Sequence, residues 1–218
     1  MPSERSKLLK DEDPDALPLR KTFVQGYIWG GTVDMPPHLH KLTLLFFPFY
    51  LSLIPVARVL TRPTGLFSLA LDKFVGPRTP KSIAVLIGLG FFNTYLLSAT
   101  GSVYAQSTTP RGYQNQTPRL TKEKLRGVYH RLVSAHQSLL ETFPGFGLAA
   151  LLVLFTHSSG MFKGPVTPLI DGLFLAFFCK QIIFPIAYIA GEDFTRSNAH
   201  ILSVSSQLYV LWDLITAL

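Results

Sequence analysis

A polar stripe on an otherwise apolar segment, residues 125–141, is the strongest chemical pattern in the chain. At about 100° per residue of an α-helix, its polar members share one face or the edge of that face: His130, Arg131, Ser134, Gln137, Ser138 and Glu141. We expect this stripe to face the protein interior. Glu141 is the deepest member, and a carboxylate within an apolar span is costly unless it is paired. It therefore indicates either a binding site or a structural ion pair with Arg131 or a neighbouring helix.

Lys180 and Gln181 lie in the middle of a second apolar segment, where a lysine costs roughly 3 kcal/mol. On a regular helix Gln181 shares a face with Phe184 and Tyr188, while Lys180 points about 100° away. Two interpretations stay open. Either the pair contributes to a ligand site, or Lys180 extends to the membrane interface and Gln181 makes an interhelical hydrogen bond.

Arg196 and Ser197 precede the last apolar segment. An arginine and a hydroxyl beside a helix N-terminus suit an anion or a thiolate, because positive charge, N–H donors and the helix dipole converge there. An interfacial anchor and a helix cap are the alternative.

The composition indicates that these side chains are held by helices that cross a membrane. Hydrophobic residues make up 48% of the 218 residues and charged residues 15%, against about 25% charged in a soluble domain. A membrane-spanning helix needs about 20 mostly apolar residues, and four segments meet this standard: 82–105, 125–156, 169–189 and 199–218. We therefore expect an all-α membrane protein with a four-transmembrane-helix bundle, integral to the membrane and in contact with lipid.

Two regions precede the first predicted span. Residues 1–40 are polar and mix both charge signs; they lack the apolar core of a signal peptide and carry too many acids for a mitochondrial presequence, so we expect a disordered tail. Residues 41–81 combine an apolar stretch, 42–57, with a basic linker. Pro48 and Pro55 interrupt that stretch, which is either an interfacial anchor or a short extra span.

The net charge of +7 comes largely from short loops, so we interpret it as a topology signal and expect no nucleic-acid partner. The loop 106–124 and its flank carry five basic residues against Glu123, which predicts a cytosolic side. Five further basic residues precede the first span on the opposite side, and the charge pattern leaves the topology open.

The sequence lacks the residues that a disulfide or a metal site would need. Cys179 is the one cysteine, which excludes an intrachain disulfide and a cysteine zinc site. His38 and His40 have no nearby partners of metal-ligand type, and we expect no metal site. We place His200 at the membrane interface.

Three stretches together resemble a known family. Thr117-Pro118-Arg119 is similar to an Asn-Pro-Arg motif of that family. The most specific stretch reads Arg131-x-x-x-Ala135-His136-Gln137-Ser138-x-x-Glu141-x-Phe143-Pro144-x-Phe146. The third runs from Gln181, Phe184, Pro185 and Tyr188 to Arg196-Ser197 and resembles Arg-x-x-Tyr-x-x-x-Tyr followed by Arg-Ser. Residues 82–218 thus resemble the membrane-associated proteins in eicosanoid and glutathione metabolism, MAPEG, and in particular its microsomal glutathione transferases.

The resemblance implies a homotrimer in the endoplasmic reticulum or another organelle membrane, with glutathione as co-substrate bound between subunits. Arg119 and Arg131 would bind its carboxylates and Glu141 its amine, while Arg196, helped by Ser197, would stabilise the thiolate. The remaining glutathione contacts implied by the motifs are Gln137, Ser138, Gln181 and Tyr188. A lipophilic small-molecule substrate would enter from the bilayer.

The chain departs from the family pattern at three positions. Ser138 replaces an asparagine, and Gln181 and Phe184 replace an arginine and a tyrosine, which removes a carboxylate partner and a hydroxyl. Two functions therefore stay open. The first is a glutathione-dependent transferase, isomerase or peroxidase acting on a lipophilic electrophile, and the second is a non-catalytic lipid-binding or scaffold protein.

Overall fold

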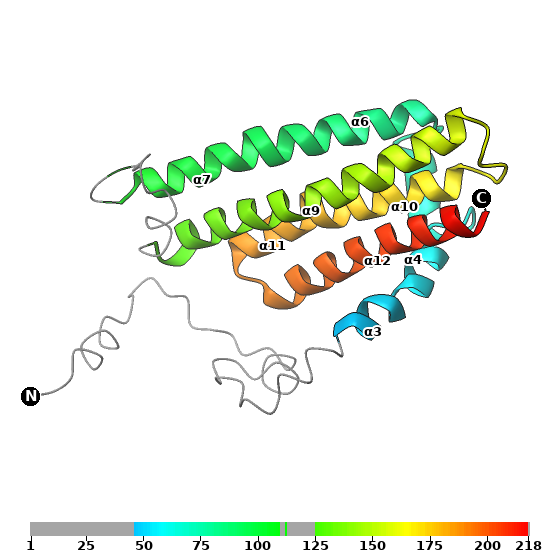
Figure 1. Cartoon of the computed structure of the whole chain (residues 1–218). Helices are drawn as coiled ribbons and strands as arrows, with labels where there is room; N and C mark the ends of the chain where they lie inside the picture. The colour runs from blue at the N-terminus through cyan, green and yellow to red at the C-terminus, as the bar shows by residue number, and fades with distance from the viewer. Residues whose placement is uncertain (1–45, 110–111, 113–124, 218) are drawn as a thin grey trace, which may run out of the picture.

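Four long helical rods form the body of the chain in the computed structural model, which describes residues 46–109, 112 and 125–217. The rods are, in chain order, α6 (Pro80–Phe91) continued by η2 (Phe92–Leu97) and α7 (Ser98–Ser107); α9 (Gly127–Ser158); α10 (Thr167–Phe177) continued by η3 (Phe178–Ile183) and α11 (Phe184–Ala190); and α12 (Asp193–Ala217). Figure 1 shows them running side by side in an up-and-down bundle. Every regular element among the described residues is helical, as predicted.

Three of the rods are long and apolar enough to cross a membrane: Pro80–Ser107, Gly127–Ser158 and Thr167–Ala190. They correspond to the first three predicted spans. The fourth predicted span corresponds to α12, which is 25 residues long but carries buried serines at positions 203, 205 and 206. That α12 also crosses the membrane stays a prediction.

Local sequence explains where the rods begin and end. Thr79 and Ser82 form a reciprocal capping box at the start of α6, with Pro80 in its first turn. Gly191 ends α11 in the left-handed conformation, at φ 80°. Because a glycine adopts that conformation without steric cost, the chain reverses at once into α12.

Two of the rods contain one turn of π-helix, η2 and η3, and these turns face each other. The side chain of Asn93 in η2 donates to the backbone carbonyl of Gln181 in η3, at 2.9 Å. Pro185, four residues after Gln181, has no N–H to donate to this carbonyl as a regular helix would require. The contact supplies a partner for the carbonyl inside the apolar bundle, where an unsatisfied group would be costly.

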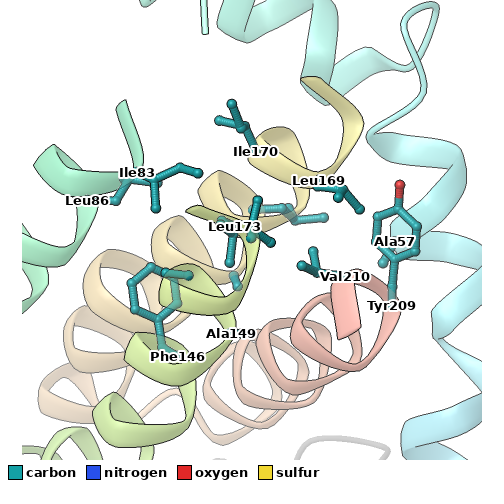
Figure 2. Packing of buried hydrophobic residues seen from close by; sticks show 14 of the residues in the cluster. Ala57, Ile83, Leu86, Phe146, Ala149, Leu169, Ile170, Leu173, Tyr209 and Val210 are labelled. Atoms are coloured by element: carbon teal, nitrogen blue, oxygen red, sulfur yellow. The ribbon is translucent and has the colours of Figure 1, made fainter. Parts of the chain in front are cut away.

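The core lies between α6, α9, α10 and α12 (Figure 2). Ile83, Leu173 and Val210 are fully buried there. A Cβ at Gly172 would lie 2.6 Å from Val210 Cγ2, so glycine is what allows α10 and α12 to approach this closely. Figure 2 shows the side chains of the cluster converging from the separate helices.

Three short helices, α3 (Phe46–Ser52), α4 (Ile54–Leu60) and α5 (Leu66–Phe74), precede the rods. The break between α3 and α4 falls at Leu53, just before Pro55, so the predicted apolar stretch becomes two short helices. The α3–α4 segment lies beside α12 (Figure 1), where Ser205 donates to the carbonyl of Tyr50 at 2.8 Å. The predicted tail, with His38 and His40, lies outside the described residues, and so does most of the basic loop.

Candidate functional site

The polar stripe of α9 lies on the outer surface of the chain. His130, Gln137 and Glu141 are exposed, whereas Ala135 and Leu139 on the opposite face are buried. The prediction that the stripe faces the interior was therefore wrong for the single chain. The reason is packing: α9 uses its apolar face against α7 and α11, and this turns the stripe outwards.

Glu141 combines this exposure with depth. It follows the first residue of α9 by fourteen positions, about 21 Å along the helix axis, which places it near the middle of the span. Its Oε1 accepts a hydrogen bond of 2.9 Å from Gln137. A carboxylate at that depth needs further polar or cationic contacts.

Lys180 is almost completely buried, with 3% of its surface exposed. Its Nζ donates to Ser138 Oγ of α9 at 2.9 Å and lies 3.0 Å from His200 Nδ1 of α12. The same amine lies 3.6 Å from the centre of the Phe184 ring. Lys180 thus points into the bundle and does not extend outwards along it, and His200 meets it there from α12. Sequence reasoning assumed a regular helix, whereas Lys180 lies in the π turn η3.

Gln181 points to a different neighbour, the π turn η2. Its Oε1 accepts from Asn93 at 2.8 Å and its Nε2 donates to Thr94 Oγ1 at 3.3 Å. Its side-chain amide is thus engaged inside the chain, as the interhelical alternative expected. Lys180 and Gln181 are adjacent in sequence but serve two separate contacts.

Arg131 lies near the N-terminal end of α9 and contacts the C-terminal end of α11. Its Nε donates to the carbonyl of Ile189 at 2.9 Å, which is favourable because the carbonyl end of a helix carries partial negative charge. A Cβ at Gly191 would lie 3.8 Å from the guanidinium, so the arginine packs directly against the turn between α11 and α12.

Arg196 and Ser197 lie in the first turns of α12, on the other side of the same turn. Arg196 forms an ion pair of 2.9 Å with Asp193, at about one third side-chain exposure. Its guanidinium also lies 4.8 Å from the centre of the Tyr188 ring. Arg131, Tyr188 and Arg196 are thus gathered at one end of the bundle, while Ser138 and Glu141 lie deeper. Arg119 lies outside the described residues.

Sequence reasoning missed Asp171, a fully buried carboxylate of α10. Arg78 binds it in bidentate fashion, with Nε–Oδ1 2.7 Å and Nη2–Oδ2 3.0 Å, and Ser68 donates to Oδ2 at 2.5 Å. Arg78 also pairs with Asp72. The hydrogen bond to Asp171 raises the pKa of Arg78 above its ordinary value, outweighing the effect of burial. The available signal was an acid inside a predicted span, which requires a partner.

The comparisons with known proteins give one result. The model of the MAPEG family matches residues 82–216, from the start of α6 to the end of α12. It leaves α3, α4 and α5 outside the match. No curated protein and no solved structure matches the chain.

Proposed function

Because the chain belongs to the MAPEG family, a membrane family that includes glutathione transferases and related proteins, we propose that it binds glutathione and uses its thiolate against a lipophilic electrophile. The observation that carries this proposal is the exposed carboxylate of Glu141 within a membrane-spanning helix. Such a group is stable in that position when a cationic ligand or another subunit covers it. The amine of glutathione supplies such a cation.

The position of the stripe supports a homotrimer with the ligand between subunits. The charged Glu141 would otherwise face lipid tails, which cannot solvate a carboxylate. A neighbouring copy that covers this face would exclude lipid and leave a polar space along α9. We place the assembly in the endoplasmic reticulum or another organelle membrane.

The residues at the end of the bundle supply the remaining roles. Arg131 and Arg119 would bind carboxylate, and Tyr188 would line the site beside Arg196. Arg196, helped by Ser197 and the N-terminus of α12, would stabilise the thiolate while it shares its charge with Asp193. In conjugation with an α,β-unsaturated aldehyde, the thiol proton passes to water and the sulfur bonds to the β-carbon. The C=C π electrons move towards the carbonyl oxygen, and the resulting enolate takes a proton from water at its α-carbon. Isomerisation and peroxide reduction would use the same thiolate.

Turnover tests the proposal. Purified protein in lipid nanodiscs, given glutathione and a long-chain α,β-unsaturated aldehyde, should form the conjugate. Glu141→Gln and Arg196→Ala should each lower the rate roughly 100-fold, the scale seen when a charge-stabilising group is lost. Asp72→Asn, a carboxylate-to-amide change in the exposed part of α5, is the matched control and should leave the rate unchanged. Unchanged turnover in both site variants would refute the assignment.

One observation favours the second function, a non-catalytic lipid-binding or scaffold protein. Gln181 is bound to Asn93 and Thr94, and Phe184 has no hydroxyl to offer a ligand. Absence of conjugate with every acceptor, together with absence of glutathione binding, would favour this function.

A further inference from the structure

Lys180 is a buried amine whose partners are neutral. Ser138 Oγ, His200 Nδ1 and the Phe184 ring surround its Nζ. Among the residues that the structure describes, the ion pairs involve Arg58, Arg78 and Arg196, and none involves Lys180. A buried ammonium is stable when an anion joins it, since neutral groups alone do not repay the loss of hydration.

The contact with Ser138 brings this amine to the functional stretch of α9. Ser138 lies three residues before Glu141, so the two side chains are neighbours on the helix. The ion pairs of the described residues do not include one between Glu141 and Lys180. A positive and a negative group therefore lie near each other, one buried and one exposed.

Such a pair of opposite charges matches a group that carries both an ammonium and a carboxylate on one carbon. In glutathione only the γ-glutamyl end has this arrangement, because the glycine end carries a carboxylate alone. We propose that Lys180 binds the α-carboxylate of the γ-glutamyl end while Glu141 binds its α-ammonium. This inference rests on the proposed function and assigns the orientation of the ligand in that site.

The neighbours of Lys180 suit this role. Ser138 and His200 hold the amine by neutral hydrogen bonds, so they position its charge without cancelling it. The flexible four-carbon stem of lysine lets the amine move from Ser138 to a ligand carboxylate on the same side. Arg131 lies seven residues before Ser138, about 10 Å along α9, and remains for the glycine carboxylate. The order along the helix thus gives the γ-glutamyl end the deeper position.

A pair of ligands tests the assignment by calorimetry on the full-length protein in nanodiscs. One ligand is glutathione, and the other is 4-aminobutyryl-cysteinyl-glycine, which lacks only the γ-glutamyl α-carboxylate. The wild type should bind glutathione at least tenfold more tightly than the analogue. In Lys180→Met this preference should disappear because glutathione binding weakens, while binding of the analogue is unchanged. Lys180→Arg, which keeps the charge, should retain part of the preference.

Each other outcome has a distinct meaning. If wild-type protein binds both ligands equally, the assignment is overturned even without any variant, and this holds if Lys180→Met fails to fold. If Lys180→Met weakens both ligands alike, Lys180 acts on the general structure of the site and the assignment is likewise overturned. In both cases glutathione binding itself survives. If the wild type binds neither ligand, the proposed function fails and the assignment falls with it.

Discussion

Two charged regions inside the bundle differ in how completely the chain satisfies them. Around Asp171, every described charge is matched within the chain: Arg78 binds the carboxylate through two nitrogens, and Ser68 occupies a further acceptor position. Around Lys180, a buried amine meets only neutral groups, and the nearby Glu141 faces outwards. An incomplete buried charge is costly, and we therefore propose that a group from outside the chain completes it. The first region stabilises the fold, and the second is our proposed binding region.

The two regions also differ in their relation to the family. Arg78 and Ser68 lie before residue 82, outside the matched part of the chain, and they attach α5 to α10. Lys180 and Glu141 lie inside the matched part. The short N-terminal helices thus stabilise one end of the bundle in a way that the family match does not cover.

Removing the buried carboxylate of Asp171 should have the largest effect on the free energy of unfolding. Asp171→Ala leaves the buried Arg78 without its main partner, and the free energy of unfolding should fall by about 3–5 kcal/mol. Denaturant unfolding in detergent measures this, with Asp72→Asn as the exposed control, which should cost under about 1 kcal/mol. The double variant Arg78→Met/Asp171→Leu should recover most of the loss. If Asp171→Ala lowers the free energy of unfolding no more than Asp72→Asn does, the Asp171 region is not the structural ion pair described above.

Removing the amine of Lys180 should change the free energy of unfolding in the opposite direction. Lys180→Met removes a buried amine that has no carboxylate partner and keeps most of its volume, so the free energy of unfolding without ligand should rise by about 1 kcal/mol. The same unfolding experiment measures it. A loss as large as that of Asp171→Ala would show that Lys180 is a structural residue.

Gln181→Leu separates the role of Gln181 from that of its neighbour Lys180. It removes the hydrogen bonds to Asn93 and Thr94, and the free energy of unfolding should fall by about 1 kcal/mol, as for other interhelical polar contacts in membranes. Glutathione binding should not change. Weaker glutathione binding in a variant that folds normally would instead place Gln181 in the ligand site.

The smallest effect should come from Arg58, whose pair with Asp213 is about one third exposed. Arg58→Met should lower the free energy of unfolding by about 0.5 kcal/mol, and less at high salt because exposed pairs are screened. Unfolding at two salt concentrations checks this. A larger, salt-independent loss would mean that α4 contributes as much as α5 to holding the bundle together.

The sequence predicted the first three rods to within two residues at each end, because apolar length is a local property. The start of α12 was placed six residues late, because the prediction followed apolar residues and the first turns of α12 are polar. An acidic residue such as Asp193 in the first turn favours a helix. The pairing of Arg78 with Asp171 joins positions 93 residues apart, and no local pattern contains it.

The candidate site was only partly predictable for a related reason. Helical periodicity groups side chains on a face, but it does not say whether that face meets another helix, a ligand or a second copy. The α9 stripe was grouped correctly and oriented wrongly. For Lys180 the π turn η3 changed the direction of the side chain, and the resulting contact with Ser138 could not be inferred from spacing on a regular helix.

Thermal unfolding of the purified protein with and without millimolar glutathione, in the wild type and in Glu141→Gln, tests whether the chain binds glutathione through Glu141. A ligand that binds only the folded state raises its stability by mass action. We expect a higher unfolding temperature for the wild type with glutathione and no such rise for Glu141→Gln. If glutathione leaves the unfolding temperature of the wild type unchanged, glutathione binding is refuted and a non-catalytic membrane protein is favoured.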